Sequence, residues 1–141
     1  MLIPKRPAKN LTEADVEAVI NCGVIDFSKL DGLIPHEVPN TWSANPGDRI
    51  KFGFKYEWIN STDSSAWHVH GHAPDFMAPG GSNASNRWVV RIKHNNRWLL
   101  QVKNHPAVGN PSHWTRNAKL ANQTHVPATS ETLRRGRRNS L

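Results

Sequence analysis

The sequence predicts an α+β protein with a small antiparallel β-sheet core, an N-terminal helix and long loops rich in Gly, Pro and Asn. Three observations predict this fold class. A segment near the N-terminus carries the capping signals of a short helix. Several later segments alternate between apolar and polar residues, as half-buried strands do. Clusters of turn-forming residues separate these segments.

The helix is predicted in the segment "NLTEADVEAVINCG". Thr12 is suited to cap its start, acidic residues occupy the first turn, and Gly23 follows the last turn. The next segment, residues 26–48, contains three prolines and two glycines, which predicts a loop with at most one short strand. Cys22 is the only cysteine, which excludes an internal disulfide and predicts a small buried side chain.

The clearest predicted strand is "DRIKFGFKYEWIN", in which every second residue is apolar or aromatic. The side chains expected on its buried side are Ile50, Phe52, Phe54, Tyr56 and Trp58.

A second strand is predicted at "AWHVHG", after the breaker "STDSS". Because side chains alternate across a strand, its histidines should share one face, opposite Trp67, Val69 and Gly71. The histidines expected on that face are His68, His70 and His72.

A hairpin is predicted where "RWVVRIK" and "RWLLQVK" flank "HNN", with a tight turn at Asn95 and Asn96. Trp88, Val90 and Ile92 should line the buried face of its first strand. Residues 104–128 have no clear period, so we expect a loop with a short helical piece near 115–122. The six tryptophans are expected mainly in the core.

The chain divides into four predicted parts: a basic arm (1–10), an acidic helix and loop (11–48), a β core with the candidate site (49–128) and an Arg-rich tail (129–141). The acidic part should either shield the basic face of the core or cover its other side. The tail arginines, which could contact the phosphates of a nucleic acid, are Arg134, Arg135, Arg137 and Arg138.

The net charge of +7 is concentrated around the histidines. Residues 49–130 hold ten Lys and Arg against three acidic residues, whereas residues 10–48 hold seven acidic residues against one lysine. A basic field around possible proton-transfer groups favours a phosphate-bearing substrate, and a solvated basic surface is the alternative.

Membrane insertion is not expected, because no run approaches the ~18 apolar residues that a membrane span needs. The N-terminal "MLIPKRPAK" lacks the apolar core of a signal peptide, so export would need another route.

A metal site and an acid–base site are the two chemical interpretations of the histidine cluster. Two histidines at positions i and i+2 can share a zinc, but all three cannot, because His68 and His72 lie ~13 Å apart on an extended strand. The sequence also lacks the H-E-x-x-H or paired Cys/His spacing that is typical of zinc sites. We therefore expect no metal and no other cofactor. A metal-dependent nuclease using His68 and His70 remains the less favoured interpretation.

Metal-free RNA cleavage requires one group that deprotonates the 2′-OH, one that protonates the leaving 5′-oxygen, and cations or N–H groups at the phosphate. His72, at a strand end, and His125, in "NQTHVP", are the expected proton-transfer pair, in either order. We expect Arg91 to hold the phosphate, Thr124 to hydrogen-bond it, and Asp75 to orient a histidine or shape the loop. The expected substrate-binding residues are Ser82, Asn83, Lys93, His70 and His113. His68, His94 and His105 are expected to be surface or structural histidines.

Two motifs, "HAPDFMAPGGSNASNRWVVRI" (72–92) and "NPSHWTRNAKLANQTHVP" (110–127), resemble the polymorphic toxin type 30 family of bacterial toxin domains. The resemblance covers about residues 50–127 and implies a predicted ribonuclease, held in check by a cognate immunity protein. It also implies a fold like the barnase–EndoU–colicin–RelE group, whose members cleave RNA without metal.

The sequence thus favours a metal-independent endoribonuclease that forms a 2′,3′-cyclic phosphate, secreted or injected into the cytoplasm of a target cell. The alternative is a non-catalytic, nucleic-acid-associated assembly protein with a toxin-like fold, for example in a virion or an injection particle. In that case a larger assembly would order the basic tails.

Overall fold

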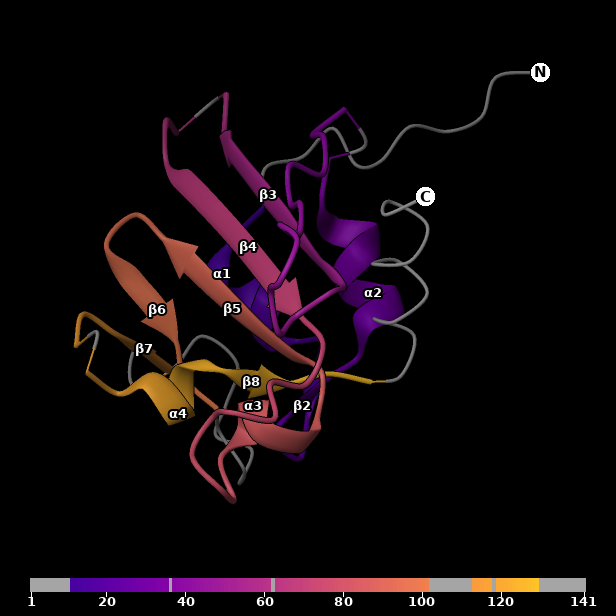
Figure 1. Ribbon diagram of the computed structural model, residues 1–141. Helices are drawn as coiled ribbons and strands as arrows, with labels where there is room; N and C mark the ends of the chain where they lie inside the picture. The colour runs from indigo at the N-terminus through magenta and orange to yellow at the C-terminus, as the bar shows by residue number, and fades with distance from the viewer. Residues whose placement is uncertain (1–10, 36, 62, 102–112, 118, 130–141) are drawn as a thin grey trace.

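The computed structural model describes residues 11–35, 37–61, 63–101, 113–117 and 119–129. Its centre is a six-stranded antiparallel sheet with the order β3-β4-β5-β6-β7, in which β8 pairs with β5 (Figure 1). The strands are β3 (Gly53–Ile59), β4 (Ala66–His72), β5 (Val89–His94), β6 (Arg97–Leu99), β7 (Trp114–Thr115) and β8 (Val126–Pro127). The predicted α+β class with an antiparallel core is therefore confirmed.

The N-terminal elements cover one face of this sheet. They are α1 (Glu13–Glu17), β1 (Ile20–Asn21), β2 (Val24–Ile25) and α2 (Phe27–Leu33). In Figure 1, α1 lies behind the sheet and α2 lies beside it. Phe27 of α2 packs on Phe54 of β3 with ring centroids 5.2 Å apart, and Val16 and Leu30 are fully buried in the same core. The core consequently lies between the sheet and residues 11–34.

Gly71 explains how β4 fits against this core. A Cβ atom at residue 71 would come within 2.2 Å of Phe54, which is closer than real side chains approach. Glycine thus lets the Phe54 ring cross β4 on the buried face, immediately before the strand ends at His72.

The predicted short N-terminal helix is present, but it ends earlier than Gly23, the residue expected to follow its last turn. α1 has five residues, and its start is capped as predicted, by a capping box between Thr12 and Asp15. The chain then forms the β1–β2 hairpin, whose turn places Cys22 at φ 52° and Gly23 at φ 78°. Gly23 serves this turn rather than a helix end, and Cys22 is exposed rather than buried.

Three further expectations are corrected. Residues 26–48 contain α2, which begins at the N-cap Asp26, so they are not only loop. The loop predicted at 104–128 contains β7 and β8 beside the short helix α4 (Ala121–Thr124). Trp67, Trp88 and Trp114 are buried as expected, whereas Trp42, Trp58 and Trp98 are partly exposed.

The hairpin between β5 and β6 is confirmed, with Asn95 at φ 54° in its turn. No helix in the described part of the chain is long and apolar enough to cross a membrane.

Candidate active site

The face of the sheet opposite α1 carries a row of histidines beside a row of cations. In the register of β4 and β5, His70 is the partner of Arg91, and His68 is the partner of Lys93. From the other side, Lys55 of β3 is the partner of His70. Because paired residues in a sheet point to the same face, these side chains form one basic surface.

His72 and His125 come together at the end of this row. Their ring centroids are 5.9 Å apart and their planes are inclined at 65°. The Nδ1 atom of His72 lies 2.8 Å from the carbonyl oxygen of Ala73. A carbonyl can only accept, so Nδ1 donates its proton and the neutral ring presents Nε2 as an acceptor. The proximity expected for a proton-transfer pair is present, and the catalytic roles of the two residues remain a prediction.

Asn83, which begins the short helix α3 (Asn83–Asn86), positions His125. Its Nδ2 group donates to the carbonyl oxygens of Asn122 and His125, each at 3.0 Å, and to Gln101 Oε1 at 2.8 Å. Its backbone N–H donates to Asn122 Oδ1 at 2.8 Å. Asn83 was expected to bind substrate, but these contacts within the protein make it a residue that ties the 73–86 loop to α4.

Arg91 is held from two sides. Its Nη2 donates to Thr124 Oγ1 at 3.3 Å, and its guanidinium carbon lies 4.1 Å over the centre of the Trp98 ring. Burial lowers the pKa of Arg91, although an arginine stays charged at neutral pH. Its Nε atom is buried and has no hydrogen-bond partner among the described residues. Thr124 is fully buried, so it serves the site by holding Arg91.

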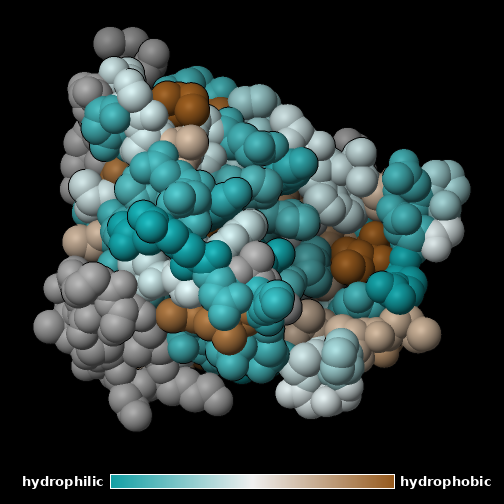
Figure 2. Space-filling model, turned by 90° about the vertical axis from the view of Figure 1, so that its left-hand side faces the viewer, coloured by the Kyte–Doolittle hydropathy of each residue, from teal (hydrophilic) through white to brown (hydrophobic). Residues whose placement is uncertain are grey.

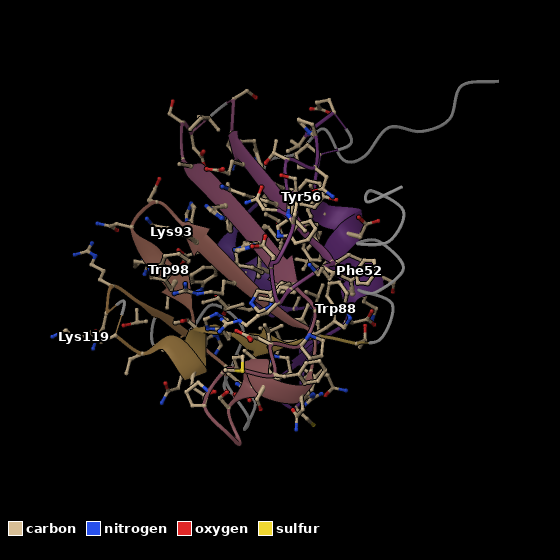
Figure 3. The ribbon with its side chains drawn as sticks, in the orientation of Figure 1. Phe52, Tyr56, Trp88, Lys93, Trp98 and Lys119 are labelled. Carbon is tan, nitrogen blue, oxygen red and sulfur yellow. The ribbon has the colours of Figure 1, made fainter. Side chains whose placement is uncertain are left out.

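Lys93 extends the basic surface beyond Arg91. Its Nζ atom lies 5.2 Å from the centre of the same Trp98 ring, and the two side chains lie next to each other in Figure 3. The side of the molecule around β6, β7 and α4, which faces the viewer in Figure 2, is mostly hydrophilic. A basic, polar surface of this kind suits a phosphate backbone.

Arg49 is a site residue that sequence reasoning missed. It donates from Nη2 to Asp75 Oδ2 at 3.1 Å, and its side chain is 59% exposed. Asp75 also accepts the Met77 N–H at 3.0 Å, so it both shapes the loop after β4 and places Arg49. The only signal in the sequence was a basic residue shortly before β3, and its position does not reveal Asp75 as a neighbour 26 positions away.

Two hollows meet at Arg49 and His72. The first has a volume of about 260 Å³ and is also lined by Trp42 and His70. The second, of about 400 Å³, is also lined by His125 and Ser82. His72 therefore lines both hollows, and His125 lines the larger one.

The two histidines that precede His72 are kept neutral. Burial first, and then the neighbouring His72 and His68, lower the pKa of His70 to about 4. Burial also lowers the pKa of His68, against the opposing effect of Glu57. At neutral pH these rings can donate or accept hydrogen bonds without adding charge to a surface that is already basic.

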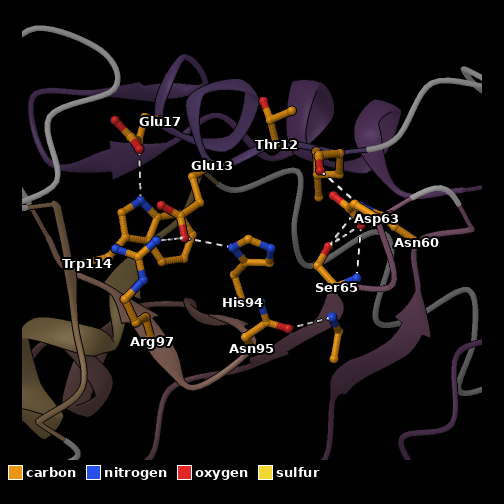
Figure 4. A network of polar contacts seen from close by, with 12 residues as sticks. Thr12, Glu13, Glu17, Asn60, Asp63, Ser65, His94, Asn95, Arg97 and Trp114 are labelled. Atoms are coloured by element: carbon orange, nitrogen blue, oxygen red, sulfur yellow. Dashed lines mark hydrogen bonds and ion pairs between the residues drawn. The ribbon is translucent and has the colours of Figure 1, made fainter.

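His113 lies on the other face of the sheet, away from the site for which it was predicted. It is 4% exposed, and its Nδ1 lies 2.5 Å from Glu17 Oε1. Glu17 Oε2 accepts the Trp114 Nε1–H, and Glu13 contacts both His94 and Arg97 (Figure 4). His113 is thus a structural residue of the contact between α1 and the sheet, and His94 is structural as expected.

The remaining predicted residues are a loop serine and the tail. Ser82 lines the larger hollow. Its backbone N–H bonds Pro79 and that of Asn83 bonds Asn122, so these two N–H groups of the loop are used within the protein. Arg134, Arg135, Arg137 and Arg138 lie outside the described residues. Within the described ranges, no group of three or more His, Cys, Asp or Glu could hold a metal ion.

The described part of the chain is thus a small α+β domain with two converging histidines on a basic face of its sheet. Comparison with protein families matches residues 29–129 to the bacterial toxin 30 family. The chain belongs to this family, which confirms the resemblance found in the sequence. The match begins at residue 29, earlier than the start at about residue 50 that the two motifs gave. Residues 29–33 of α2 and the loop that carries Trp42 and Arg49 therefore belong to the family domain. Comparisons with curated proteins and with solved structures gave no match.

Proposed function

We propose that this bacterial toxin domain is a metal-independent endoribonuclease that cleaves RNA through a 2′,3′-cyclic phosphate. The observation that carries the proposal is the pair of His72 and His125, whose rings lie 5.9 Å apart and which both line the larger hollow. Two imidazoles at this separation can flank one phosphodiester, which is what in-line attack by the 2′-oxygen requires.

His72 acts as the base in this proposal. Its Nδ1–H is engaged with the Ala73 carbonyl, so the neutral ring takes up a proton at Nε2. Nε2 removes the proton of the 2′-OH, and the 2′-oxygen forms a bond to phosphorus. The bond from phosphorus to the 5′-oxygen breaks, and His125 gives its proton to that oxygen. The products are a 2′,3′-cyclic phosphate and a 5′-hydroxyl end.

Arg49 and Arg91 supply the positive charge. Negative charge accumulates on the non-bridging oxygens in the transition state, where preorganised cations stabilise it most. Arg91 is fixed by Thr124 and Trp98, and Arg49 by Asp75, so both guanidinium groups are ordered before substrate binds. Lys93 and Lys55, along the same face, continue the positive surface for the rest of the RNA.

The biological setting follows from the family. A bacterial toxin acts on another cell, so we propose that the domain is secreted or delivered and is neutralised by a cognate immunity protein in the producing cell. An inhibitor of acidic character that covers the histidine face would fit the charge of this surface.

The test is to incubate the purified protein with total RNA in EDTA and to identify the product ends. We expect cleavage to persist in the chelator and to leave 2′,3′-cyclic phosphate and 5′-hydroxyl ends. Cleavage that stops in EDTA and returns with added metal would contradict the proposal. RNA binding without cleavage would favour the nucleic-acid-associated assembly protein instead.

A further inference from the structure

We propose that the larger hollow, between the loop after β4 and α4, is a subsite for one nucleobase of the RNA, with Phe76 stacking on the base at its entrance. This inference rests on the proposed function and names the part of the substrate that the site recognises. The hollow shares Arg49, His72 and His125 with the proposed catalytic centre. Any group bound there is therefore directly next to the bond that is cleaved.

The chemistry of the walls suits a flat heterocycle. Met77, Ala78 and Pro79 contribute apolar groups to the lining of the hollow, and Ser82 and Asn122 contribute polar groups. A volume of about 400 Å³ lies in the range of small-molecule sites, which combine mostly apolar walls with a few polar groups. The smaller hollow, lined by Trp42, lies on the other side of His72 and Arg49 and can hold the neighbouring nucleotide.

Ser82 is available to read the edge of a base. It occupies the N-cap position of α3, where a serine hydroxyl normally accepts a backbone N–H, yet its side chain makes no cap hydrogen bond. Its Oγ is buried and has no partner among the described residues. An unsatisfied buried hydroxyl costs free energy, and a base that offers an acceptor or a donor would remove that cost.

Asn122 supplies a second, oriented group. Its Oδ1 accepts the Asn83 N–H at 2.8 Å, which fixes the amide and directs its Nδ2 donors away from α3. A hydroxyl and an amide donor on one wall can discriminate between bases by their donor and acceptor patterns.

Phe76 is the stacking surface. Its side chain is 84% exposed and that of Met77 is 70% exposed, between Asp75 and Ala78 in the loop that lines the hollow. Phe76 itself is not part of the lining, but its neighbours Asp75 and Met77 are, so Phe76 and Met77 form an exposed apolar pair beside the hollow. Aromatic rings bind unpaired bases by stacking, and removal of one such ring weakens binding roughly 5- to 100-fold.

The experiment measures binding of short single-stranded RNA oligonucleotides with 2′-fluoro sugars, which cannot be cleaved by 2′-OH attack. The series contains the intact oligonucleotide and versions with one abasic residue at each position in turn. We expect one abasic position to weaken binding to the wild-type chain strongly. Phe76→Ala should weaken binding of the intact oligonucleotide about 5- to 100-fold and leave binding of that abasic version unchanged.

Two variants sharpen the result. Ile59→Ala removes an apolar residue that is also exposed (62%), at the opposite end of β4, where Ile59 pairs with Ala66. This variant should still bind the intact oligonucleotide more tightly than the abasic one. Ser82→Ala removes only the hydroxyl, makes no change in helix capping, and should alter the order of preference among bases at the same position.

The outcomes separate the two proposals. If Phe76→Ala weakens the binding of intact and abasic RNA equally, or changes the binding of neither, the subsite is excluded even when the wild-type chain cleaves RNA. If the wild-type chain does not cleave RNA but the abasic effect depends on Phe76, the endoribonuclease proposal fails and the base subsite stands.

Discussion

The two faces of the sheet use histidine in opposite ways. On the α1 side, each described histidine has a carboxylate at its Nδ1. Glu13 lies 2.7 Å from His94 (Figure 4), and Glu17 lies 2.5 Å from His113. On the other face, His72 donates its Nδ1–H to a backbone carbonyl, and its ring faces His125. A histidine that is hydrogen-bonded to a carboxylate of α1 fixes that helix to the sheet, while His72 uses only Nδ1 within the protein.

The N-terminal segment contributes side chains to the α1 face of the sheet. Glu13 and Glu17 precede residue 29, where the family match begins, yet they complete the environment of His94, Arg97 and His113 inside the matched range. α1 therefore covers the face opposite His72, with Glu13 and Glu17 bonded to the sheet rather than exposed to solvent. The part of the acidic segment that does reach the histidine face is the loop with Trp42 and Asp48, which ends next to Arg49.

The largest expected effect is the loss of cleavage on the histidine face. His72→Ala and His125→Ala should each lower kcat/KM by about 10²- to 10⁴-fold, the contribution of one acid–base group. Stability should fall by no more than about 1 kcal/mol for His72→Ala, because one hydrogen bond to Ala73 is lost. Single-turnover cleavage and urea unfolding measure the two effects. His68→Ala, on the same face, should lower kcat/KM by less than about tenfold. A loss as large as that of His72→Ala would show that His72 has no special role among the histidines of this face.

On the α1 face the effect should be on stability. Glu17→Ala leaves the Nδ1 of His113 and the Nε1–H of Trp114 without their buried acceptor, which should cost about 3–5 kcal/mol. Urea unfolding followed by tryptophan fluorescence measures it. Glu57→Ala is the matched control, because this carboxylate is 56% exposed in its pairs with Lys55 and His68, and it should change stability by less than about 1 kcal/mol. Similar losses in the free energy of unfolding for both variants would show that burial of the carboxylate does not determine its contribution to stability.

The pH dependence of stability should report His70. Its pKa is about 4 in the folded protein, below the ordinary value of 6.5, so the unfolded chain binds more protons between these values. Stability is therefore complete above pH 6.5 and falls as the pH is lowered towards 4. Allowing for solvent screening of this half-buried ring, the loss should be about 1–2 kcal/mol.

His70→Asn is the control for this measurement, made by urea unfolding at a series of pH values. The variant should flatten the pH dependence, while His72, His68, Lys55 and Arg91 still surround the position. An unchanged slope would assign the effect to other groups.

The smallest expected effect is at the start of α1. Thr12 Oγ1 accepts the Asp15 N–H and Asp15 Oδ2 accepts the Thr12 N–H, both at 3.1 Å. Thr12→Ala should lower the free energy of unfolding by about 1 kcal/mol, and Thr12→Ser should largely preserve it. Chemical denaturation of both variants provides the measurement, and a loss of several kcal/mol in Thr12→Ala would mean that the cap also governs the docking of Glu13 and Glu17.

The sequence by itself determined the three longest strands, β3, β4 and β5, and their faces. The alternation in residues 53–59 and 66–72 has a period of two, and burial follows it: Phe54, Tyr56, Trp67 and Val69 face the core while the histidines face away. It also determined the capped start of α1, the Asn95 turn and the family, because each of these depends on residues that are close in the chain.

Only the tertiary structure decided which of the distant residues meet. His72 and His125 are 53 positions apart, and their contact depends on β8 pairing with β5 and on Asn83 holding α4. Arg49 reaches Asp75, and His113 goes to Glu17, on the opposite face from the one predicted. A local pattern records the direction of a side chain relative to its own strand. The identity of its partner is set by packing between segments, because many pairings of the same charged and polar residues are compatible with one sequence.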